Sequence, residues 1–600
     1  MYLLFTSFFN NVEAQVEINA YEPNGIPNFA NSNDDFSVSV TPLSEPSSSS
    51  IDLFVYSTWV NDEGFYEPGY GNPGFIGYTT DYGESSFVNF DFSGGPIQIK
   101  LKCNYCYDEN IDIKTVVIRP RNYSITPIID NVNKTITFKL INPLNLSVEI
   151  NGNRTRNMHI FSSELNDLEP TTHYTTVTEM TNNLEQRRGQ SLDSDEVWYY
   201  PNSGDTIYID GNEVFRGGIY LDGVSDVSII GRGIIDNQGF QKNYCHPNGN
   251  NPNCDSIPLG YDYVMGIRVR KSSNINITGI IINDVQHHAI KITESENVTI
   301  KDYKAITRVI WGEGIYLEAS KNFTASELFI RSAEDCIAIY AGRNMGNWMT
   351  EGGIDNVTVT NSSFYADRAH PIALGWHGPV IDGESLIPDE NVAHLQNITF
   401  ENIDILQHDE YLNDYHGAIA INCGDNNYCQ NMLFKDIRVE DFNYGALLRL
   451  KVEPEGAANI VRSDGYRINN IVFDGLTYNY SNSNDSNSII TGLSQARYVN
   501  GVHFNNLVIN YNSIQNASQY PKFVLGNDIY DITFNDLPKN TLPFDINSNP
   551  NGIKNGKYRI QNVETIGTMP RYLNIENTFD SIITAPWITD WFISYTGNNS

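Results

Sequence analysis

Three carboxylates near the middle of the chain stand at a spacing that suits hydrolysis of glycosidic bonds. Glu313 precedes one short apolar segment, and Glu334 and Asp335 precede the next, 21 and 22 residues later. In a chain of stacked β-repeats, residues one repeat apart lie on neighbouring strands ~5 Å from each other. Carboxyl groups this close in a sugar-sized groove can act as general acid and general base, because crowding keeps one of them protonated. We expect the three to form a catalytic corner, although each motif alone is more typical of an exposed turn.

The following repeat adds a histidine and an indole to the same corner. It spans residues 368–377 and contains His370 and Trp376. Histidine can hydrogen-bond an ionised base or a sugar hydroxyl, and tryptophan can stack on the apolar face of a pyranose. We predict that His370 and Trp376 bind substrate, with a purely structural role for His370 as the alternative. Trp311 and His288, in adjacent upstream repeats on the same flank, are weaker candidates for substrate subsites.

Two alternating strand types explain how these residues could meet. One begins with asparagine, as in Asn297-Val-Thr-Ile, and the other is apolar, as in Cys336-Ile-Ala-Ile. They recur every 21 to 25 residues in the early repeats and every 30 to 40 in the later ones. This period, with asparagine at one corner, indicates a right-handed parallel β-helix, because asparagine tolerates the left-handed conformation and can hydrogen-bond its neighbours in a stack. Insertions in the turns could wall a groove on one flank: residues 343–353, 378–391 and 408–416.

Residues before the repeats follow a different pattern of polar and apolar residues. Polar and apolar residues alternate between about residues 35 and 150, with Gly, Pro and Asn between the segments, which is typical of an antiparallel β-sandwich. A polar connector follows. We therefore predict an all-β protein with a β-sandwich and connector over residues 15–195, a β-helix over 196–520 and a C-terminal cap over 521–600.

Charge and hydropathy exclude several classes of partner. The 600 residues carry a formal net charge of −34 at pH 7, which would repel the phosphates of nucleic acid. No apolar run approaches the ~18 residues that a membrane span requires. The same charge mildly disfavours an anionic polymer as substrate, unless a local basic patch overrides it. We expect a monomer that binds a polysaccharide without a cofactor or a metal ion.

Several features indicate secretion. Residues 1–14 combine a short apolar core with a small residue before the expected cleavage point, and we interpret them as a secretion signal, with a buried strand as the alternative. Cys336 is expected to be a buried thiol. Sequons such as the one at Asn322 predict N-glycosylation, although asparagine also suits the coil corner. The other cysteines form close pairs typical of disulfides: Cys103 with Cys106, Cys245 with Cys254, and Cys423 with Cys429.

Several segments resemble sequence signatures of known families. Glu313-Gly314 and Glu334–Ile339 are similar, at the same spacing, to the NTDG and DDCIAI signatures of the polygalacturonases, glycoside hydrolase family 28. His370–Gly375 resembles the GHGxxxG strand of that family, and residues 231–236 resemble its early coil. The N-terminal half fits a sister family better, the family 49 dextranases and isopullulanases, which place a β-sandwich ahead of the β-helix. The segments similar to family 49 are residues 76–81, 117–123 and 371–376.

Both families imply hydrolysis with inversion at the anomeric carbon. By matching positions, Glu334 would be the general acid, and Glu313 and Asp335 would hold the nucleophilic water. The families use Asp at all three positions, so each Glu here moves a carboxylate by ~1.5 Å, one carbon–carbon bond, against the ~6.5–9.5 Å separation that inversion requires. The family's Asn before the first carboxylate is also missing, since Trp311-Gly312 stands there. Either the cleft has adjusted, for another linkage or sugar, or activity is weak or lost.

Three hypotheses for function follow. The first is a secreted hydrolase of a neutral α-linked glucan such as dextran, favoured by the sandwich-plus-helix organisation and the acidic composition. The second is a pectin-type hydrolase of polygalacturonate, favoured by the coil spacing and the Cys-Ile-Ala-Ile strand. The third is a non-catalytic β-helix protein that binds glycans and has lost the chemistry.

Overall fold

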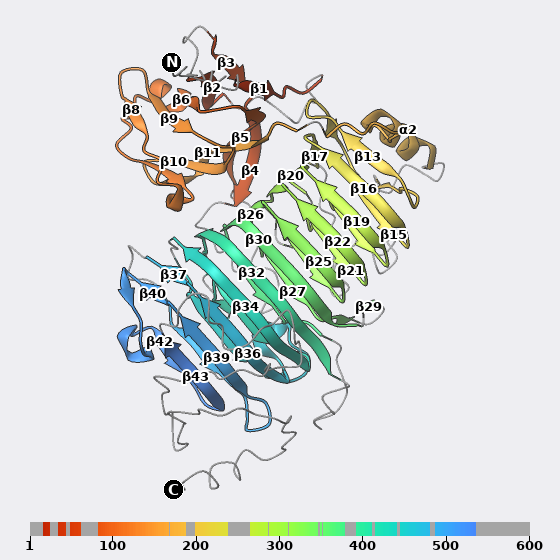
Figure 1. The fold of residues 1–600 in the computed structure, drawn as a ribbon, viewed down its shortest axis with the longest axis vertical. Coiled ribbons are helices and arrows are strands. Elements are labelled where there is room, and N and C mark those ends of the chain that lie inside the picture. Colours follow the sequence, from red (N-terminus) through yellow and green to blue (C-terminus); the bar gives the residue numbers. More distant parts are fainter. Residues whose placement is uncertain are drawn as a thin grey trace, which may run out of the picture.

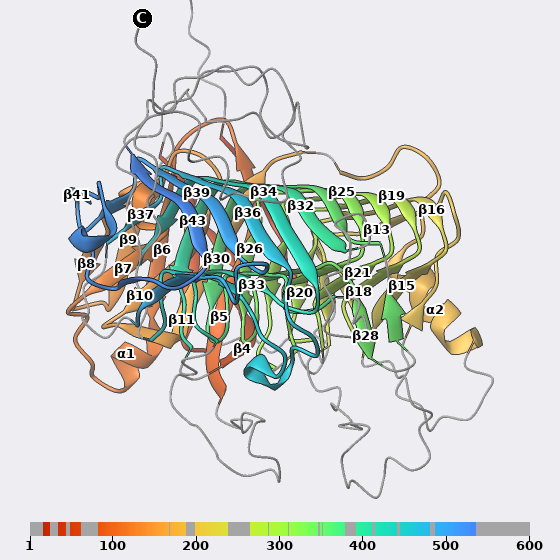
Figure 2. The ribbon, with the colours of Figure 1, turned by 90° about the horizontal axis from the view of Figure 1, so that it is seen from below.

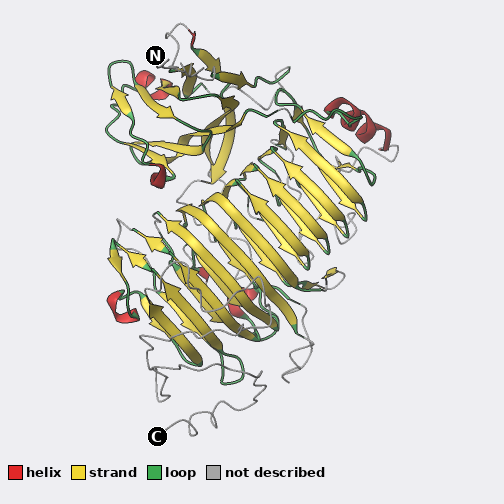
Figure 3. Ribbon diagram, in the orientation of Figure 1, coloured by secondary structure: helices red, strands yellow, loops and turns green. Residues whose placement is uncertain are grey.

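Two β-rich parts lie side by side in this protein, a β-sandwich and a long parallel β-helix (Figure 1). Strands dominate both parts and helices are few and short (Figure 3). The predicted fold class is confirmed. The computed structural model describes the following residues, to which every structural statement refers: 16–24, 34–43, 49–61, 82–166, 168–187, 198–237, 264–285, 287–309, 311–345, 348–350, 352–378, 392–410, 415–440, 444–479 and 486–535.

The sandwich has two sheets whose strands alternate between buried and exposed residues. In β2, Phe36, Val38 and Val40 are buried while Ser37 is exposed, because successive side chains of a strand point to opposite faces. One sheet has the order β1-β5-β11-β10-β7, with β4 paired to β5, and the other has the order β3-β2-β6-β9-β8. The elements are β1 Glu17–Ala20, β2 Phe36–Pro42, β3 Ile51–Leu53, β4 Tyr56–Asn61, β5 Tyr82–Ser93, β6 Ile97–Cys103, α1 Asn104–Asp108, β7 Val116–Arg119, η2 Arg121–Tyr123, β8 Ile128–Asp130, β9 Thr135–Leu140, β10 Asn145–Ile150 and β11 Asn153–Glu164.

One parallel sheet of the β-helix carries the candidate site, and we call it the site sheet. Its 11 strands follow one another coil by coil, so that Ile290, Ile315, Ile337 and Ile372 pair in register and are all completely buried. The helix α2 Val177–Arg187 precedes it. Its strands are β12 Trp198–Tyr199, β15 Gly218–Asp222, β18 Ile267–Arg270, β21 Ile290–Thr293, β24 Ile315–Glu318, β27 Ile337–Tyr340, β31 Ile372–Leu374, β33 Ile419–Cys423, β35 Leu448–Val452, β38 Ser488–Thr491 and β42 Phe523–Leu525.

A 19-stranded sheet forms the remaining walls of the coils. Its pairing is parallel except between β40 and β41, and a hairpin of β28 Arg343–Met345 and β29 Trp348–Thr350 projects from one turn. The strands are β13 Thr206–Ile209, β14 Val214–Phe215, β16 Ser225–Gly231, β17 Ile234–Asp236, β19 Ser273–Thr278, β20 Ile281–Asn283, β22 Glu296–Lys301, β23 Lys304–Ile306, β25 Lys321–Ser326, β26 Phe329–Ser332, β30 Ile354–Ala366, β32 Ala393–Gln407, β34 Asn427–Val439, β36 Arg467–Asp474, β37 Thr477–Tyr478, β39 Val499–Asn505, β40 Val508–Ile509, β41 Asn512–Ser513 and β43 Ile529–Asn535. The short 3-10 helices η5 Ala457–Asn459 and η6 Ala517–Gln519 lie between later strands.

Identical positions of successive coils stack on one another inside the β-helix. Phe434, Phe473, Phe504 and Phe534 form a continuous pile, with ring centroids 4.9 to 5.0 Å apart and planes within 13° of parallel. Each coil therefore buries its apolar side chains against the coils above and below it. The stack continues past residue 520, the predicted start of the cap, as far as β43, and the predicted cap beyond Asn535 lies outside the described residues.

Asparagines form a ladder along one corner of the coils, as the strand pattern predicts. Asn297, Asn322 and Asn356 have positive φ of 53° to 60°, and each side-chain amide donates to the side-chain oxygen of the preceding rung at 2.9 to 3.1 Å. Asparagine tolerates this left-handed conformation better than most residues. The ladder thus satisfies the amide groups that the sequons supply.

The sandwich packs along one flank of the β-helix (Figures 1 and 2). Buried apolar residues of both parts form one cluster: Tyr56, Val60, Phe87 and Phe161 from the sandwich, and Ile234, Ile281, Ile306, Phe329, Tyr365 and Leu406 from the coils. The β-helix residues of this cluster come from successive coils, so the sandwich contacts several coils and not one.

The cysteines bear out part of the disulfide prediction. Cys103 and Cys106 are joined, whereas Cys423 and Cys429 are free buried thiols, so the predicted pairing of Cys423 with Cys429 is wrong. Both thiols pack inside the coil, where cysteine behaves as a small apolar residue. Cys336 is a buried thiol, as predicted. Cys245, Cys254 and the predicted signal segment lie outside the described residues, among which no helix is long and apolar enough to cross a membrane.

Candidate active site

Strand register in the site sheet brings four of the predicted residues into one row. His288, Glu313, Asp335 and His370 each stand two positions before a paired isoleucine on consecutive strands. Backbone hydrogen bonds continue through the row: Ala289 donates to the carbonyl of Glu313 (2.8 Å), Gly314 to that of Asp335 (3.1 Å), and Cys336 to that of His370 (2.8 Å). Neighbouring strands are ~4.8 Å apart, so the side chains of this row lie next to one another.

Asp335 is held by three hydrogen bonds. His370 approaches one carboxylate oxygen twice, through Nδ1 at 2.7 Å and through its backbone N–H at 3.0 Å, and Tyr340 donates its hydroxyl to the other oxygen at 3.2 Å. Asp335 and His370 are 1% and 0% exposed. These three bonds hold the carboxylate of Asp335 in one orientation.

Glu313 forms the second carboxylate–histidine pair of the row. Its Oε2 contacts Nδ1 of His288, and both residues are buried. The imidazole of His288 stacks on the ring of Tyr316, with centroids 4.5 Å apart and planes 20° from parallel. Tyr316 therefore fixes the orientation of the histidine, and the histidine fixes that of the carboxylate.

Glu334 lies beside the row in a different environment. It is half-buried, and its Oε2 accepts a hydrogen bond from the backbone N–H of Trp311 at 3.4 Å. Burial raises the pKa of Glu334 well above its usual value, and the charges of Glu313 and Asp335 raise it further, against a lowering by Arg368 and the Trp311 N–H. Glu334 therefore stays protonated at a pH where ordinary glutamates are ionised, as a general acid must.

Close packing explains the two glycines around Glu313. A Cβ on Gly314 would lie 2.2 Å from Cγ2 of Ile330, and a Cβ on Gly312 would lie 2.5 Å from the carbonyl oxygen of Val309. No side chain fits at either position, so only glycine lets the turn run this close to the neighbouring strands.

The tryptophans behave differently from each other. Trp311 is half-buried next to Glu334, with its ring 5.9 Å from that of His287, and keeps part of its indole accessible. Trp376 is completely buried and stacks on Tyr415 at 5.1 Å, so the prediction that it stacks on a sugar is wrong for this structure. Tyr415 lies in the insertion of residues 408–416, just before β33 of the next coil, and for that reason the local motif did not reveal the cover.

A group of cations on the outer face of the site sheet was missed by the sequence reasoning. Lys291 stands in register with Arg268 and Tyr316, and its ammonium lies 4.7 Å from the ring centroid of Tyr316. Arg343 of the hairpin lies 3.2 Å from Nε2 of His377. We call Arg268, Lys291 and Arg343 the basic cluster.

The members of the basic cluster act on one another. The pKa of Lys291 is lowered to about 8, first by burial and then by the charges of Arg343 and Arg268, against the opposing effect of Glu318 and Glu313. Lys291 thus lies in the field of two cations and of the carboxylates of Glu318 and Glu313. In each strand of the site sheet, apolar inward residues alternate with outward ones. Arg268, Lys291 and Tyr316 occupy the same outward position on consecutive strands, and this sequence pattern could have located Lys291.

Comparison with known proteins decides the family. The model of the glycosyl hydrolases family 28 matches residues 206–521. This chain belongs to that family. This membership is in line with the resemblance of its motifs. Among the described residues, no group of three or more His, Cys, Asp and Glu could hold a metal ion.

Individual relatives of this family 28 member are distant. A probable polygalacturonase of Arabidopsis thaliana is 22% identical over 271 residues, which cover 38% of this chain and 59% of that protein. The family 28 exopolygalacturonase of Yersinia enterocolitica has a similar fold at 12% identity, a TM-score of 0.41, and coverage of 74% of this chain and 97% of that one. Dex49A from Penicillium minioluteum is 12% identical, with a TM-score of 0.46, and covers 85% and 96%.

Proposed function

We propose that this protein hydrolyses α-glycosidic bonds of a uronate-containing polysaccharide with inversion at the anomeric carbon. Glu334 donates its proton to the glycosidic oxygen as the carbon–oxygen bond breaks. A water held by Glu313 and Asp335 attacks the opposite face of the sugar and gives up its proton to this carboxylate pair. The two-carboxylate chemistry of inverting hydrolases requires such an arrangement.

The proposal depends on one observation above all. Glu334, whose pKa is raised well above its usual value, stands beside two carboxylates that each contact a histidine. Environments that push neighbouring carboxyl groups toward opposite protonation states assign one as acid and the other as base. The half-buried indole of Trp311 at this corner supports a sugar subsite beside Glu334.

The basic cluster supports an anionic sugar as the substrate. Arg268, Lys291 and Arg343 gather on the outer face of the site sheet, in a chain that has 38 Lys and Arg against 72 Asp and Glu. Cations that share a partly buried site repel one another, and a substrate carboxylate would relieve that repulsion. Polygalacturonate carries one carboxylate on each sugar and could therefore place one beside these cations.

A neutral α-glucan such as dextran is the second candidate. The formal net charge of −34 favours it, because the field of the whole protein repels a polyanion outside the range of the basic cluster. The two candidates differ in whether the local attraction of the basic cluster for a carboxylate exceeds the long-range repulsion by the net negative charge.

A substrate panel tests the proposal. Release of reducing sugar is measured with polygalacturonate, dextran and pullulan, and the anomeric configuration of the first product is followed by NMR. We expect turnover of polygalacturonate with inversion. Turnover of dextran but not of polygalacturonate would favour the neutral glucan, and binding without turnover on every substrate would favour a glycan-binding protein that has lost the chemistry.

A matched pair of variants tests the role of the basic cluster. Lys291→Met should raise KM for polygalacturonate about tenfold, since hydrogen bonds to charged groups contribute ~1.5–3 kcal/mol. Lys301→Met serves as the control, because Lys301 is an exposed residue of β22 paired with Glu327 and lies on another sheet. Equal KM values for both variants would refute an anionic subsite at Lys291.

Secretion as a glycoprotein and a monomeric state also belong to the proposal. The Cys103–Cys106 disulfide supports an oxidising compartment. Expression in a eukaryotic host should deliver the protein to the medium, where intact mass measures attached glycans and light scattering measures the oligomeric state.

A further inference from the structure

A buried arginine stands at the start of the catalytic turn. Arg331 lies in β26, three residues before Glu334, and Asp367 follows β30, three residues before His370. The two side chains form a bidentate ion pair, with Nε to Oδ2 at 2.9 Å and Nη2 to Oδ1 at 2.8 Å. Neither residue is appreciably exposed. The pair therefore joins the two segments that lead into the catalytic residues of neighbouring coils.

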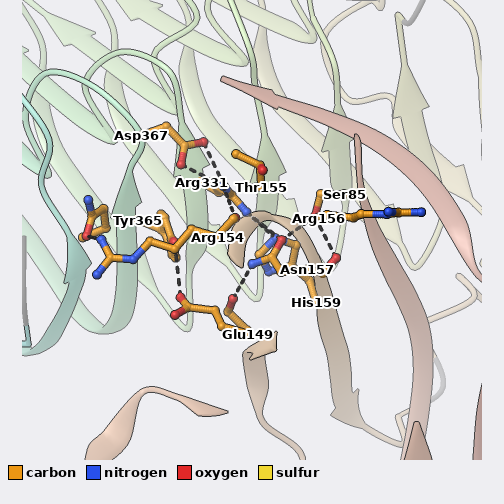
Figure 4. A network of polar contacts seen from close by, with 12 residues as sticks. Ser85, Glu149, Arg154, Thr155, Arg156, Asn157, His159, Arg331, Tyr365 and Asp367 are labelled. Carbon is orange, nitrogen blue, oxygen red and sulfur yellow. Dashed lines mark hydrogen bonds and ion pairs between the residues drawn. The ribbon is translucent and has the colours of Figure 1, made fainter. Parts of the chain in front are cut away.

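The other donors of Arg331 point into the sandwich (Figure 4). Nη1 donates to Oδ1 of Asn157 at 2.9 Å and to Nε2 of His159 at 3.2 Å, and Nη2 donates to the carbonyl oxygen of Arg154 at 2.8 Å. All three acceptors belong to β11. A guanidinium has five N–H groups, and here two bind Asp367 and three bind the sandwich, so every donor is satisfied.

The acceptors on β11 are themselves held in place. Asn157 accepts a hydrogen bond from the hydroxyl of Ser85 at 2.7 Å and donates to that of Ser147 at 2.9 Å. Burial lowers the pKa of His159 well below its usual value, and the charge of Arg331 lowers it further, so the ring is neutral and can accept the Arg331 bond through Nε2. The sandwich thus offers Arg331 a rigid set of acceptors.

Ser332, the residue after Arg331, connects this anchored segment to the backbone of the two glutamates. The hydroxyl of Ser332 accepts the backbone N–H of Glu334 at 3.0 Å and donates to the carbonyl of Gly312 at 3.0 Å, directly before Glu313. The backbone N–H of Asp367 donates to the carbonyl of Ser332 at 2.8 Å. Movement of Arg331 would therefore displace both glutamates.

We infer that Arg331 is a positioning residue through which the N-terminal sandwich sets the geometry of the catalytic corner. The sandwich is then a working part of the hydrolase and not a separate module beside it. The inference rests on the proposed function of Glu334 and Glu313, since it concerns how these groups are held.

The test compares two buried arginines of the β-helix, Arg331 and Arg232, that both bind the sandwich. Arg331→Lys keeps the charge but cannot make five bonds, and misplacement of catalytic groups by ~1 Å costs ~10²-fold, so we expect kcat to fall by that order while KM stays within twofold. Asp91→Asn is the matched control: it weakens the buried bond to Arg232, 2.8 Å long, which joins the sandwich to the coil of β16 and β17. The control should lose thermal stability but keep kcat.

A second variant and a second measurement separate this inference from the proposed function. Asn157→Ala, which removes a single acceptor, should lower kcat less than Arg331→Lys and in the same direction. Hydrogen exchange of the peptide covering residues 332–340 should accelerate in both variants but not in Asp91→Asn, whether or not the wild type turns over any substrate. Unchanged exchange in Arg331→Lys would overturn the inference, and so would an Arg331→Lys variant whose kcat equals that of an active wild type. If the wild type is inactive but exchange is accelerated in both variants, the result counts against the proposed function alone.

Discussion

Glu334 differs from its two neighbouring carboxylates in exposure and in hydrogen bonding. Glu313 and Asp335 are buried and each contacts a histidine, whereas Glu334 is half-buried and accepts one backbone N–H. Of the three surroundings, that of Glu334 raises the pKa of its carboxyl group well above the usual value. The two glutamates are longer than the aspartates of related families, and the histidine contacts offer a way to hold the longer side chain of Glu313.

The general acid can be tested by removing its proton. Glu334→Gln should lower kcat by ~10²–10⁴-fold, the usual contribution of general acid catalysis, and should abolish the alkaline limb of the pH–rate profile that the raised pKa of Glu334 produces. Glu327→Gln, an exposed glutamate paired with Lys301, should leave kcat unchanged. A Glu334→Gln variant with wild-type kcat would exclude this residue as the acid.

The same substitution should stabilise the protein at neutral pH. A carboxyl group whose folded-state pKa is raised contributes stability below its unfolded pKa, and that contribution is lost as pH rises through the folded value. Gln is neutral throughout, so the free energy of unfolding of Glu334→Gln should increasingly exceed that of the wild type as pH rises. Urea unfolding at several pH values measures this difference, and a constant difference would contradict it.

His288 provides a separate test of Glu313. His288→Phe keeps a flat ring on Tyr316 but removes Nδ1, the partner of the Glu313 carboxylate. We expect kcat to fall by about tenfold or more with little change in KM, because a hydrogen bond to a charged group contributes ~1.5–3 kcal/mol. If KM rises while kcat is kept, His288 binds substrate instead, the role that its sequence position first indicated.

At the scale of elements, the asparagine ladder repeats the same side-chain hydrogen bond from coil to coil of the β-helix. Each rung combines a left-handed backbone with a side-chain hydrogen bond to the next coil. The sequons of the repeats therefore have a structural reason to exist whether or not they carry glycans. Both interpretations of the sequence pattern were open, and the hydrogen bonds establish the structural one.

Substitution of one rung measures its contribution. Asn322→Ala should lower the free energy of unfolding by about 2 kcal/mol, because left-handed backbone costs a residue with a Cβ ~1–2 kcal/mol and two hydrogen bonds are lost. Asn322→Gly, which tolerates positive φ, should lose about half as much. Thr324→Ala removes the sequon but not the rung, so a loss of mass beyond that of the substitution itself, without a change in stability, would identify a glycan at this position.

At the scale of the whole molecule, the sandwich and the β-helix share an apolar cluster and the buried ion pairs Arg119–Glu440 and Asp91–Arg232. Arg119 of β7, for example, binds Glu149 of the sandwich at 2.7 Å and Glu440 of the β-helix at 2.6 Å. Separation would expose large apolar side chains and leave buried charges without partners, which is costly. The two parts should therefore unfold together.

Calorimetry tests this coupling. Phe161→Ala, at the centre of the shared cluster, should cost ~3–5 kcal/mol and lower the temperature of one common transition. Tyr511→Ala, at a residue that is 87% exposed, should have no measurable effect. Two separate transitions in the wild type, or a shift confined to one of them, would show that the parts are independent.

The pattern of the chain alone determined the repeat, its period and the register of Glu313 with Asp335, because in a solenoid spacing along the sequence becomes distance across neighbouring strands. It could not determine contacts between distant segments. The cover of Trp376 by Tyr415 and the three bonds of Arg331 to β11 join segments whose separation follows no period. Those contacts depend on how insertions fold and on how the sandwich docks, and only the tertiary structure decides them.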